Sequence, residues 1–372
     1  MTQPDVIIVG GGVIGLTTAY ALVAANMRVT VIDSGAPSAT NAAAGMLAPS
    51  FERALSASLA HDAFARASLD RWRDFAPLIE DESGVAIDFR QTGILSVAFA
   101  DETAGAFPED LQGGERLSGD EARALEPALS DEIAHASFAP GDGQIDPRAL
   151  LRALEAALTR RGAAILRGVR VAAVEAKSGA LSRVALSTGE TIGAGAAVLA
   201  TGASIDGAGM LAAGAVFPVK GEALALARIG GAPRHVIRTR SAYLCPKAAN
   251  PLMAGRVIVG ATEIPCDRSL APDDVRIEAL KAGAARAAPA LARAAEIERW
   301  AGLRPATADG LPIIGRAPEG PSGLFYALGH YRNGVLLAPA TADALTRLIV
   351  SGKAGEDIAA FSPARASLSA LV

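Results

Sequence analysis

The feature that most constrains this chain is a glycine-rich turn close to its first residue. A continuous β-branched run at residues 5–9 leads into Gly10, Gly12 and Gly15, and an apolar stretch at residues 13–25 follows. Continuous β-branched runs are typical of buried parallel strands. Glycines at this spacing permit a tight turn and the close approach of a ligand to the backbone. The pattern therefore predicts a strand, a turn and a helix, the opening of a strand–helix–strand unit.

An acidic residue after the next strand extends this pattern into a nucleotide site. Residues 28–32 form a second β-branched run that ends at Asp33. The helix begins at Val13 and Ile14, where free backbone N–H groups and the positive end of the helix dipole favour a pyrophosphate. Asp33 is placed to accept hydrogen bonds from a ribose hydroxyl pair, and its charge would repel a 2′-phosphate, which disfavours NADP. The fingerprint alone leaves FAD and NAD open, and an ordinary glycine-rich turn is the plain alternative.

Charge and composition exclude several classes of partner. The uncharged stretch at residues 6–27 is long enough to span a membrane, but glycines interrupt it and no positive charge precedes it, so we expect no integral membrane segment. The net charge of −4, without long runs of one sign, argues against a nucleic-acid partner. Two isolated cysteines, Cys245 and Cys266, make no disulfide framework and favour a cytoplasmic location. Four scattered histidines predict no metal site.

The rest of the chain alternates between nucleotide-type patterns and less regular stretches. A helix is strongly indicated after Asp146, which can cap it, because Pro147 suits its first position and Gly162 can end it. Its apolar face comprises Leu150, Leu151, Leu154 and Leu158. Other predicted elements are a loop at 34–50, helices at 63–82, 120–126, 273–287 and 334–351, and strands at 163–175, 196–201, 222–227, 256–262, near 313 and at 324–327.

This order predicts two interleaved domains in a mixed α/β (α+β) fold, because the nucleotide-type pattern resumes after each irregular stretch. The nucleotide-binding domain is expected to comprise residues 1–50, 140–216 and 300–372. The substrate domain is expected to comprise residues 51–139 and 217–299.

Five motifs resemble the D-amino-acid oxidase family. Residues 41–47 (NAAAGML) resemble its flavin loop, residues 143–147 (GQIDP) the entry to its middle nucleotide helix, and residues 200–202 (ATG) a strand-end turn of many FAD proteins. Residues 300–305 (WAGLRP) and 329–334 (GHYRNG) resemble its glycine oxidase branch. The matches come in family order and cover nearly the whole chain. The resemblance implies a Rossmann-type FAD-binding domain of the glutathione reductase kind and a substrate domain built on an antiparallel sheet.

The resemblance also implies which residues bind FAD. The GHYRNG run leads into a helix whose N-terminus suits the negative charge that a reduced flavin develops, although a plain turn at Gly334 is the alternative. Neither cysteine lies in the attachment motif of the related sarcosine oxidases, so we expect non-covalent FAD. The predicted cofactor-binding residues are Gly10, Gly12, Val13, Ile14, Gly15, Asp33, Ser34, Thr40, Asn41, Ala44, Gly45, Met46, Val171, Thr201, Gly202, His330, Tyr331, Arg332, Asn333, Gly334, Val335 and Leu336.

The same motifs predict the substrate-binding residues. Arg304 precedes Pro305, which favours an extended conformation, and it resembles the arginine that grips the substrate carboxylate with two parallel hydrogen bonds. Tyr243 resembles the second carboxylate ligand, and Arg332 resembles an arginine near the substrate and the flavin. With Met46 of the flavin loop, these are predicted catalytic residues. Outside their motifs, the arginines would be interpreted as surface ion pairs and the tyrosine as a core residue.

Two acidic residues stand out beside these motifs. Glu263 follows the predicted strand at 256–262, where the resemblance implies an apolar residue, and it is a further predicted catalytic residue. It could face the substrate amine or a cationic side chain, pair with Arg268, or lie in solvent. Glu52 follows the flavin loop and is either a lid residue or an ordinary loop glutamate.

The implied activity is the oxidation of glycine, sarcosine or a small D-amino acid. A hydride passes from Cα to flavin N5, O2 reoxidises the flavin to give H2O2, and the imine is hydrolysed or enters thiamine biosynthesis. The alternative enzyme is a D-amino-acid dehydrogenase that uses a quinone or another carrier as acceptor. The alternative of another class is a flavin-binding assembly or sensor subunit without turnover. The resemblance further implies a homo-oligomer, most simply a homotetramer.

Overall fold

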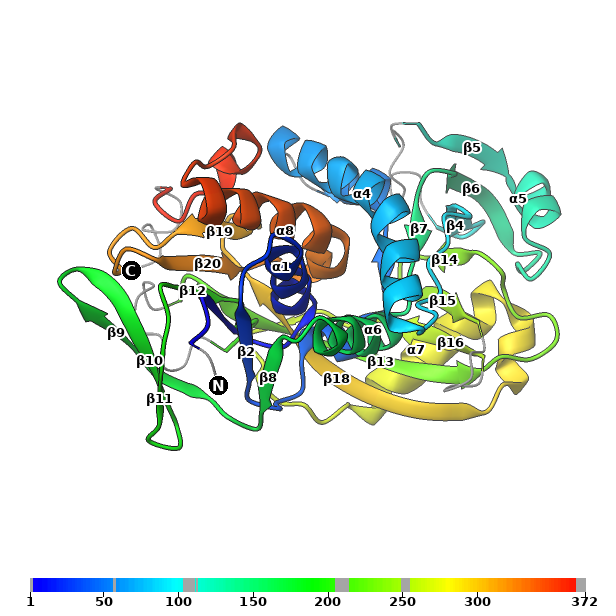
Figure 1. The fold of residues 1–372 in the computed structure, drawn as a ribbon. Coiled ribbons are helices and arrows are strands. Elements are labelled where there is room, and N and C mark those ends of the chain that lie inside the picture. Colours follow the sequence, from blue (N-terminus) through cyan, green and yellow to red (C-terminus); the bar gives the residue numbers. More distant parts are fainter. Residues whose placement is uncertain are drawn as a thin grey trace.

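A six-stranded sheet forms the centre of the nucleotide-type half of the molecule (Figure 1). The computed structural model describes residues 3–55, 58–102, 111, 113–204, 214–248 and 255–365. All neighbouring strands run parallel except at one edge, where β19 pairs antiparallel with β20. In order across the sheet they are β19 (Ile313–Arg316), β20 (Leu324–Leu328), β12 (Ala196–Leu199), β1 (Val6–Val9), β2 (Val29–Asp33) and β8 (Ala164–Arg167).

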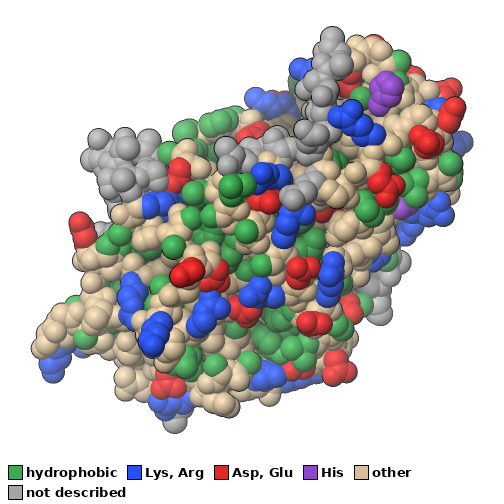
Figure 2. Space-filling view, turned by 90° about the horizontal axis from the view of Figure 1, so that it is seen from above, with side chains coloured by type: hydrophobic (Ala, Val, Ile, Leu, Met, Phe, Trp, Pro, Cys, Tyr) green, Lys and Arg blue, Asp and Glu red, His purple; other side chains and the backbone are tan. Residues whose placement is uncertain are grey.

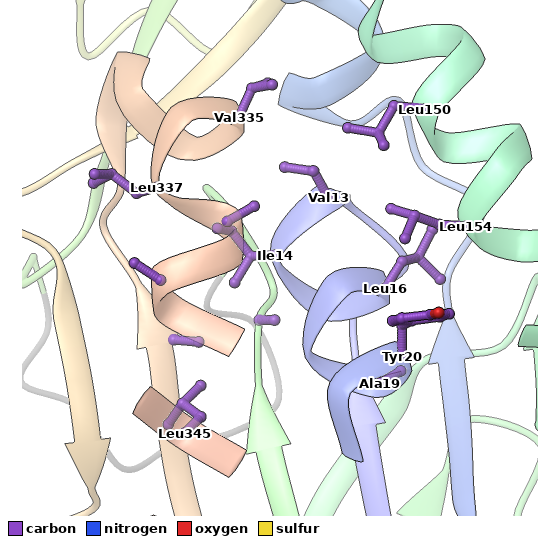
Figure 3. Close-up of a cluster of buried hydrophobic side chains, with 14 of the residues drawn as sticks. Val13, Ile14, Leu16, Ala19, Tyr20, Leu150, Leu154, Val335, Leu337 and Leu345 are labelled. Carbon is purple, nitrogen blue, oxygen red and sulfur yellow. The ribbon is translucent and has the colours of Figure 1, made fainter. Parts of the chain in front are cut away.

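Helices cover one face of this sheet and bury its apolar side chains. They are α1 (Val13–Ala24), α4 (Leu59–Ser83), α6 (Pro147–Arg160) and α8 (Gly334–Ser351). Figure 3 shows α1 packed between α6 and α8, with Leu16 and Tyr20 on the side of α6, near Leu154. The predicted cap of α6 is confirmed, because the Asp146 side chain accepts hydrogen bonds from the N–H groups of the first turn. Its predicted leucine face is buried as well.

The uncharged stretch at residues 6–27 forms β1 and α1, as the glycine turn predicts. Within the described ranges, one helical segment, Tyr331–Ser351, is long and apolar enough to cross a membrane by length and composition. Its most apolar window is 61% buried inside the protein. Ser68 and Trp72 of α4 both donate hydrogen bonds to the Leu336 carbonyl. These contacts are those of a core helix.

A three-stranded antiparallel sheet covers the opposite face of the central sheet. It consists of β9 (Val171–Lys177), β10 (Ala180–Leu186) and β11 (Thr191–Gly193). The single strand predicted at 163–175 is therefore wrong: it divides into β8 and β9. The backbone leaves the first strand at Gly168, which has a left-handed φ of 72°.

The second half of the molecule is built on a nine-stranded sheet in which every pair is antiparallel except β14 with β4. Along the sheet lie β17 (Ile264–Pro265), β13 (Phe217–Ala227), β16 (Arg256–Gly260), β15 (Tyr243–Lys247), β14 (Val236–Arg238), β4 (Ile94–Phe99), β6 (Ile133–Ala139) and β5 (Glu115–Ser118), and β18 (Glu296–Ala306) pairs with β13. Helices α5 (Gly119–Leu125) and α7 (Asp274–Ala287) pack on it. Two segments far apart in sequence thus share one sheet.

The mixed α/β class is confirmed, but several details differ from the predictions. The loop predicted at 34–50 contains α2 (Ala39–Ala42), β3 (Met46–Leu47) and the start of α3 (Pro49–Leu55). The predicted domain boundary between residues 299 and 300 falls inside β18, an eleven-residue strand paired along β13. The division into two domains otherwise stays a prediction.

The surface carries charges of both signs. Figure 2 shows Lys and Arg side chains interspersed with Asp and Glu side chains over one face. Large exposed apolar side chains occur at scattered positions, namely Leu59, Leu78, Leu270, Val275, Ile297 and Val350. The homo-oligomer therefore stays a prediction as well.

Candidate active site

One elongated cavity of about 830 Å³ connects the two sheets. At one end it is lined by the glycine turn and by Asp33, at the carboxyl edge of the parallel strands, where ligands of such sheets bind. At the other end it is lined by Arg304 and Tyr243 from the second sheet. The cavity thus joins a nucleotide-type end to an end with hydrogen-bond donors for an anion.

The glycine turn is packed so closely that side chains would not fit. Gly10 has a φ of 115°, and a Cβ on it would collide with the Ala200 carbonyl oxygen. A Cβ on Gly15 would collide with the Gly10 carbonyl oxygen. A Cβ on Gly11 would lie 2.7 Å from a carboxylate oxygen of Asp33. The missing side chains therefore let α1 approach β1 and let the acid lie against the turn.

The N-terminus of α1 faces the cavity without a side-chain cap of its own. Gly12 is its N-cap residue and makes no capping hydrogen bond, while the Val13 N–H donates to Thr40 Oγ1 over 3.1 Å. Thr40 therefore ties the segment after β2 to this helix start. The remaining free N–H groups are suited to a pyrophosphate.

The predicted flavin loop, residues 41–47, is braced from outside the cavity. The indole Nε1 of Trp300 donates to the Ala42 carbonyl over 3.0 Å. Arg148 stacks over the Trp300 ring, 4.6 Å from its centroid, and donates to the Asn41 carbonyl over 2.8 Å. Gly45 has a φ of 79°, where a side chain would collide with the Ile145 carbonyl oxygen. The loop is therefore fixed between α6 and β18.

A short turn, η2 (Tyr331–Asn333), leads into α8 at the centre of the cavity. Just before it, His330 is 4% exposed and its Nε2 lies 3.1 Å from Thr341 Oγ1. Burial lowers the pKa of His330 to about 3, so the ring is neutral. The N-terminus of the eighteen-residue helix at Gly334 then adds its positive potential to that of the arginines lining the cavity.

Arg304 and Tyr243 lie over backbone that has no side chains. A Cβ on Gly221 would lie 2.5 Å from the guanidinium carbon of Arg304, and a Cβ on Gly260 would lie 2.6 Å from the Tyr243 hydroxyl. Arg304 Nη1 also donates to the Thr262 carbonyl over 3.1 Å. Burial raises the pKa of Tyr243 to about 12, against the opposing charge of Arg304. The tyrosine therefore keeps its proton and can donate it in a hydrogen bond beside the arginine.

Glu52 is a buried partner in the site and not an ordinary loop residue. It is 7% exposed, lines the cavity, and its Oε2 accepts from Arg332 Nε over 2.8 Å and from Asn333 Nδ2 over 3.2 Å. Arg332 is therefore held by α3. His61 of α4 lies 3.5 Å from the same asparagine amide, and burial lowers its pKa.

Arg238 is a cavity residue that the sequence analysis missed. It ends β14 and is the register partner of Tyr243. Its guanidinium lies 5.1 Å from the Phe51 ring centroid, and burial lowers its pKa against the attraction of Glu52. Arg238 lies in a strand of only three residues and in no recognised motif, so the sequence did not indicate it.

Glu263 has a partner that the sequence did not indicate. The Tyr331 hydroxyl donates a hydrogen bond to Glu263 Oε1, a partner that was not among the alternatives considered from the sequence. Both residues line the cavity, next to Arg332 and Arg304. Glu263 is thus exposed to solvent and lines the cavity at the same time, and its catalytic role stays a prediction.

Most of the predicted site residues line this single cavity, including all the predicted catalytic residues. Three predicted cofactor residues do not. Gly15 packs against the turn itself, Asn41 turns its carbonyl to Arg148, and Leu336 is 1% exposed in the helical core. These three residues lie behind the cavity wall, and their role in cofactor binding stays a prediction.

The observation that decides the family is a match along nearly the whole chain. The DAO family of FAD-dependent oxidoreductases matches residues 5–348. The chain belongs to this family. FAD is accordingly its cofactor, and the Rossmann-type fold that the sequence predicts is confirmed. The cavity fits this cofactor, because the close-packed glycine turn, Asp33 and the open helix N-termini lie along its length.

Individual relatives agree with this assignment. The chain is 35% identical to a glycine oxidase from Bacillus licheniformis, over 93% of each chain. It is 34% identical to a bifunctional protein ThiO/ThiG from Synechocystis, over 98% of this chain and 54% of that protein. The crystal structure of glycine oxidase from Geobacillus kaustophilus superposes with a TM-score of 0.88 at 31% identity, covering 98% of this chain and 99% of that one.

Proposed function

We propose that this FAD-dependent oxidoreductase oxidises glycine, sarcosine or a small D-amino acid and uses O2 as acceptor, giving H2O2. The similarity to glycine oxidases over nearly the full length supports the oxidation of an amino acid. The similarity to the ThiO/ThiG protein supports a role in thiamine biosynthesis. The cytoplasmic location stays a prediction.

The observation that carries the proposal is the pair of donors at the end of the cavity opposite Asp33. Arg304 comes from β18 and Tyr243 from β15, and two glycines open the space above them. A guanidinium fork matches a carboxylate with two parallel hydrogen bonds, which fixes the orientation of the ligand as well as its affinity. An amino acid held by its carboxylate thus has its Cα turned to the middle of the cavity.

The chemistry divides between cofactor and protein. FAD, when bound, accepts the hydride from the substrate. Tyr243 remains protonated, with a pKa of about 12, and so donates to the substrate carboxylate. His330 remains neutral, with a pKa of about 3, so it adds no positive charge beside the bound substrate. Glu52 neutralises Arg332 within the site. Binding and orientation are therefore the contributions of these side chains.

An anaerobic bleaching screen tests the proposal. The FAD-loaded protein is mixed with glycine, sarcosine, D-alanine or L-alanine without oxygen, and the loss of flavin absorbance is followed. We expect bleaching by at least one of the first three compounds, then rapid recovery of the oxidised spectrum and formation of peroxide when oxygen is added. Slow recovery with oxygen but fast recovery with a quinone would identify a dehydrogenase. No bleaching by any amino acid would refute turnover and favour a sensor or assembly subunit.

A further inference from the structure

The two carboxylates at the substrate end of the cavity are in different electrostatic states. Glu52 is buried and forms an ion pair with Arg332. Glu263 is exposed, lines the same cavity, and accepts its hydrogen bond from the neutral hydroxyl of Tyr331. Within the described residues, no ion pair of Glu263 is found. Its charge is therefore available to a ligand.

Glu263 is positioned beside the carboxylate-binding arginine by a rigid neighbour. The carbonyl of Thr262 accepts from Arg304, and its hydroxyl accepts from the Glu222 backbone N–H over 2.9 Å and bonds the Glu222 carboxylate over 3.1 Å. Glu222 is fully buried. Consecutive Cα atoms are about 3.8 Å apart. A substrate anchored by its carboxylate on Arg304 therefore has the Glu263 carboxylate within reach of its side chain.

Tyr331 holds Glu263 with a bond that a cation can replace. Burial and the hydrogen bond to Glu263 raise the pKa of Tyr331 to about 12, so the phenol acts as a neutral donor. The guanidinium of Arg332 lies 5.3 Å from the phenol ring centroid, which keeps the ring beside the cavity. The bond from the phenol to the carboxylate is charge-assisted on the acceptor side only, whereas an ammonium group adds the attraction between two unlike charges. The ammonium group of a ligand can therefore replace the phenol at Glu263.

From this geometry we propose that Glu263 is a specificity-determining residue that selects amino acids with a second, side-chain ammonium group over neutral ones of the same length. The proposal rests on the proposed function, since it assumes that the substrate is an amino acid gripped by Arg304. It assigns basic D-amino acids, such as D-ornithine, to the substrate class of the enzyme.

The test compares kcat/KM for D-ornithine with kcat/KM for D-norleucine, which has a methyl group in place of the terminal ammonium. Glu263→Gln keeps the shape and the acceptor for Tyr331 but removes the charge. We expect the ornithine-to-norleucine ratio to fall about tenfold, the lower end for a charged hydrogen bond because the carboxylate is partly solvated. Glu190→Gln, on the remote three-stranded sheet, changes the net charge equally and is expected to leave the ratio unchanged.

Tyr331→Phe provides a change in the opposite direction. It removes the competing donor, so the ratio is expected to rise about threefold, a small effect because the bond that is lost is partly solvated. In the Glu263→Gln background the same substitution should change the ratio little, because the two residues act through one contact. If either variant fails to retain flavin, the salt dependence of the wild-type ratio decides. A charge attraction weakens with added salt, and an unaffected ratio overturns the proposal.

The outcomes separate this proposal from the proposed function. A ratio that changes less than twofold in Glu263→Gln overturns the selection by charge, and Glu263 then only anchors Tyr331. Bleaching by glycine with no turnover of D-ornithine overturns the proposal while the oxidase function stands. No bleaching by any amino acid overturns both.

Discussion

Asp142 gives the protein a pH-dependent stability that one substitution should remove. It lies in the turn before β7 (Gly143–Gln144) and is 1% exposed. Its Oδ1 accepts from the Ser50 hydroxyl over 2.9 Å and from the Ser50 N–H over 3.4 Å. For its buried Oδ2, no partner is found within the described part of the chain. Burial raises the pKa of Asp142 to about 7, against the smaller opposing effect of the hydrogen bonds from Ser50.

The sign of the effect follows from the two pKa values. The unfolded chain has the ordinary value of 3.8, so the folded protein binds this proton more tightly. A shift of about three pH units corresponds to about 4 kcal/mol in the free energy of unfolding. That stabilisation is complete below about pH 4 and is lost as the pH rises to about 7. Above about pH 7 the fold holds a buried carboxylate with an unpaired oxygen.

Asp142→Asn keeps the acceptor for Ser50 and removes the charge. At about pH 8 we expect the free energy of unfolding to rise by up to about 4 kcal/mol, which for a chain of this length is about 5 °C in Tm. At about pH 5 the gain should fall below about 2 kcal/mol. Urea and thermal unfolding of the FAD-loaded protein at both pH values measure it, and Asp70→Asn, whose side chain is 66% exposed, is the control. An equal gain at both pH values would refute the reasoning, as would a loss at about pH 8.

Four further predictions concern the cofactor and the substrate. Arg304→Ala should lower kcat/KM by roughly 30- to several-thousand-fold and leave the flavin content unchanged, because leaving a bound carboxylate unpaired costs about 2–5 kcal/mol. Substitution of the exposed Arg183 by alanine is the control. A loss of less than threefold would show that Arg304 does not bind the substrate carboxylate. Heat or acid should release the flavin into the supernatant, and absorbance that stays with the precipitate would contradict non-covalent binding. D-alanine should be oxidised and L-alanine only negligibly. Comparable rates would show that binding of the carboxylate does not select the configuration at Cα. Trp300→Phe removes the hydrogen bond to Ala42 and should raise the Kd of FAD for the apoprotein about two- to tenfold. A fluorescence titration measures this Kd, and an unchanged value would show that the hydrogen bond to Ala42 does not contribute to FAD binding.

Sequence patterns predicted the elements whose signals are local. The helix after Asp146 was foreseen with its cap and its leucine face, because both signals lie within fifteen residues of each other. The strands β4, β5 and β6 were missed, since each is stabilised by partners elsewhere in the chain. Strand formation there depends on non-local pairing, which periodicity does not report.

The same holds for the site: residues recognised from the sequence were predicted, and contacts between residues far apart in the chain were not. Arg304 was predicted because it lies in the motif at residues 300–305, and Tyr243 because it resembles a carboxylate ligand of the family. Arg238 was missed, and the hydrogen bond between Glu263 and Tyr331 was not foreseen, because Tyr331 lies 68 residues away in sequence. Such contacts are set when separate strands and turns meet at a cavity, and neighbouring residues carry no trace of them.

The long strand β18 sets the distance between the part of the site that faces the cofactor and the part that faces the substrate. Trp300, Gly302 and Arg304 alternate along it, so all three point to the same side of the strand. Trp300 braces the predicted flavin loop, Gly302 lets Ala42 approach closely, and Arg304 is the proposed ligand of the substrate carboxylate. The three residues span about 13 Å of strand. An insertion or deletion of one residue between them would turn one end away and disable it. The distance between the predicted flavin loop and the proposed carboxylate ligand is therefore set by one strand, and we expect changes of substrate to require substitutions in side chains that border β18 and not changes in its length.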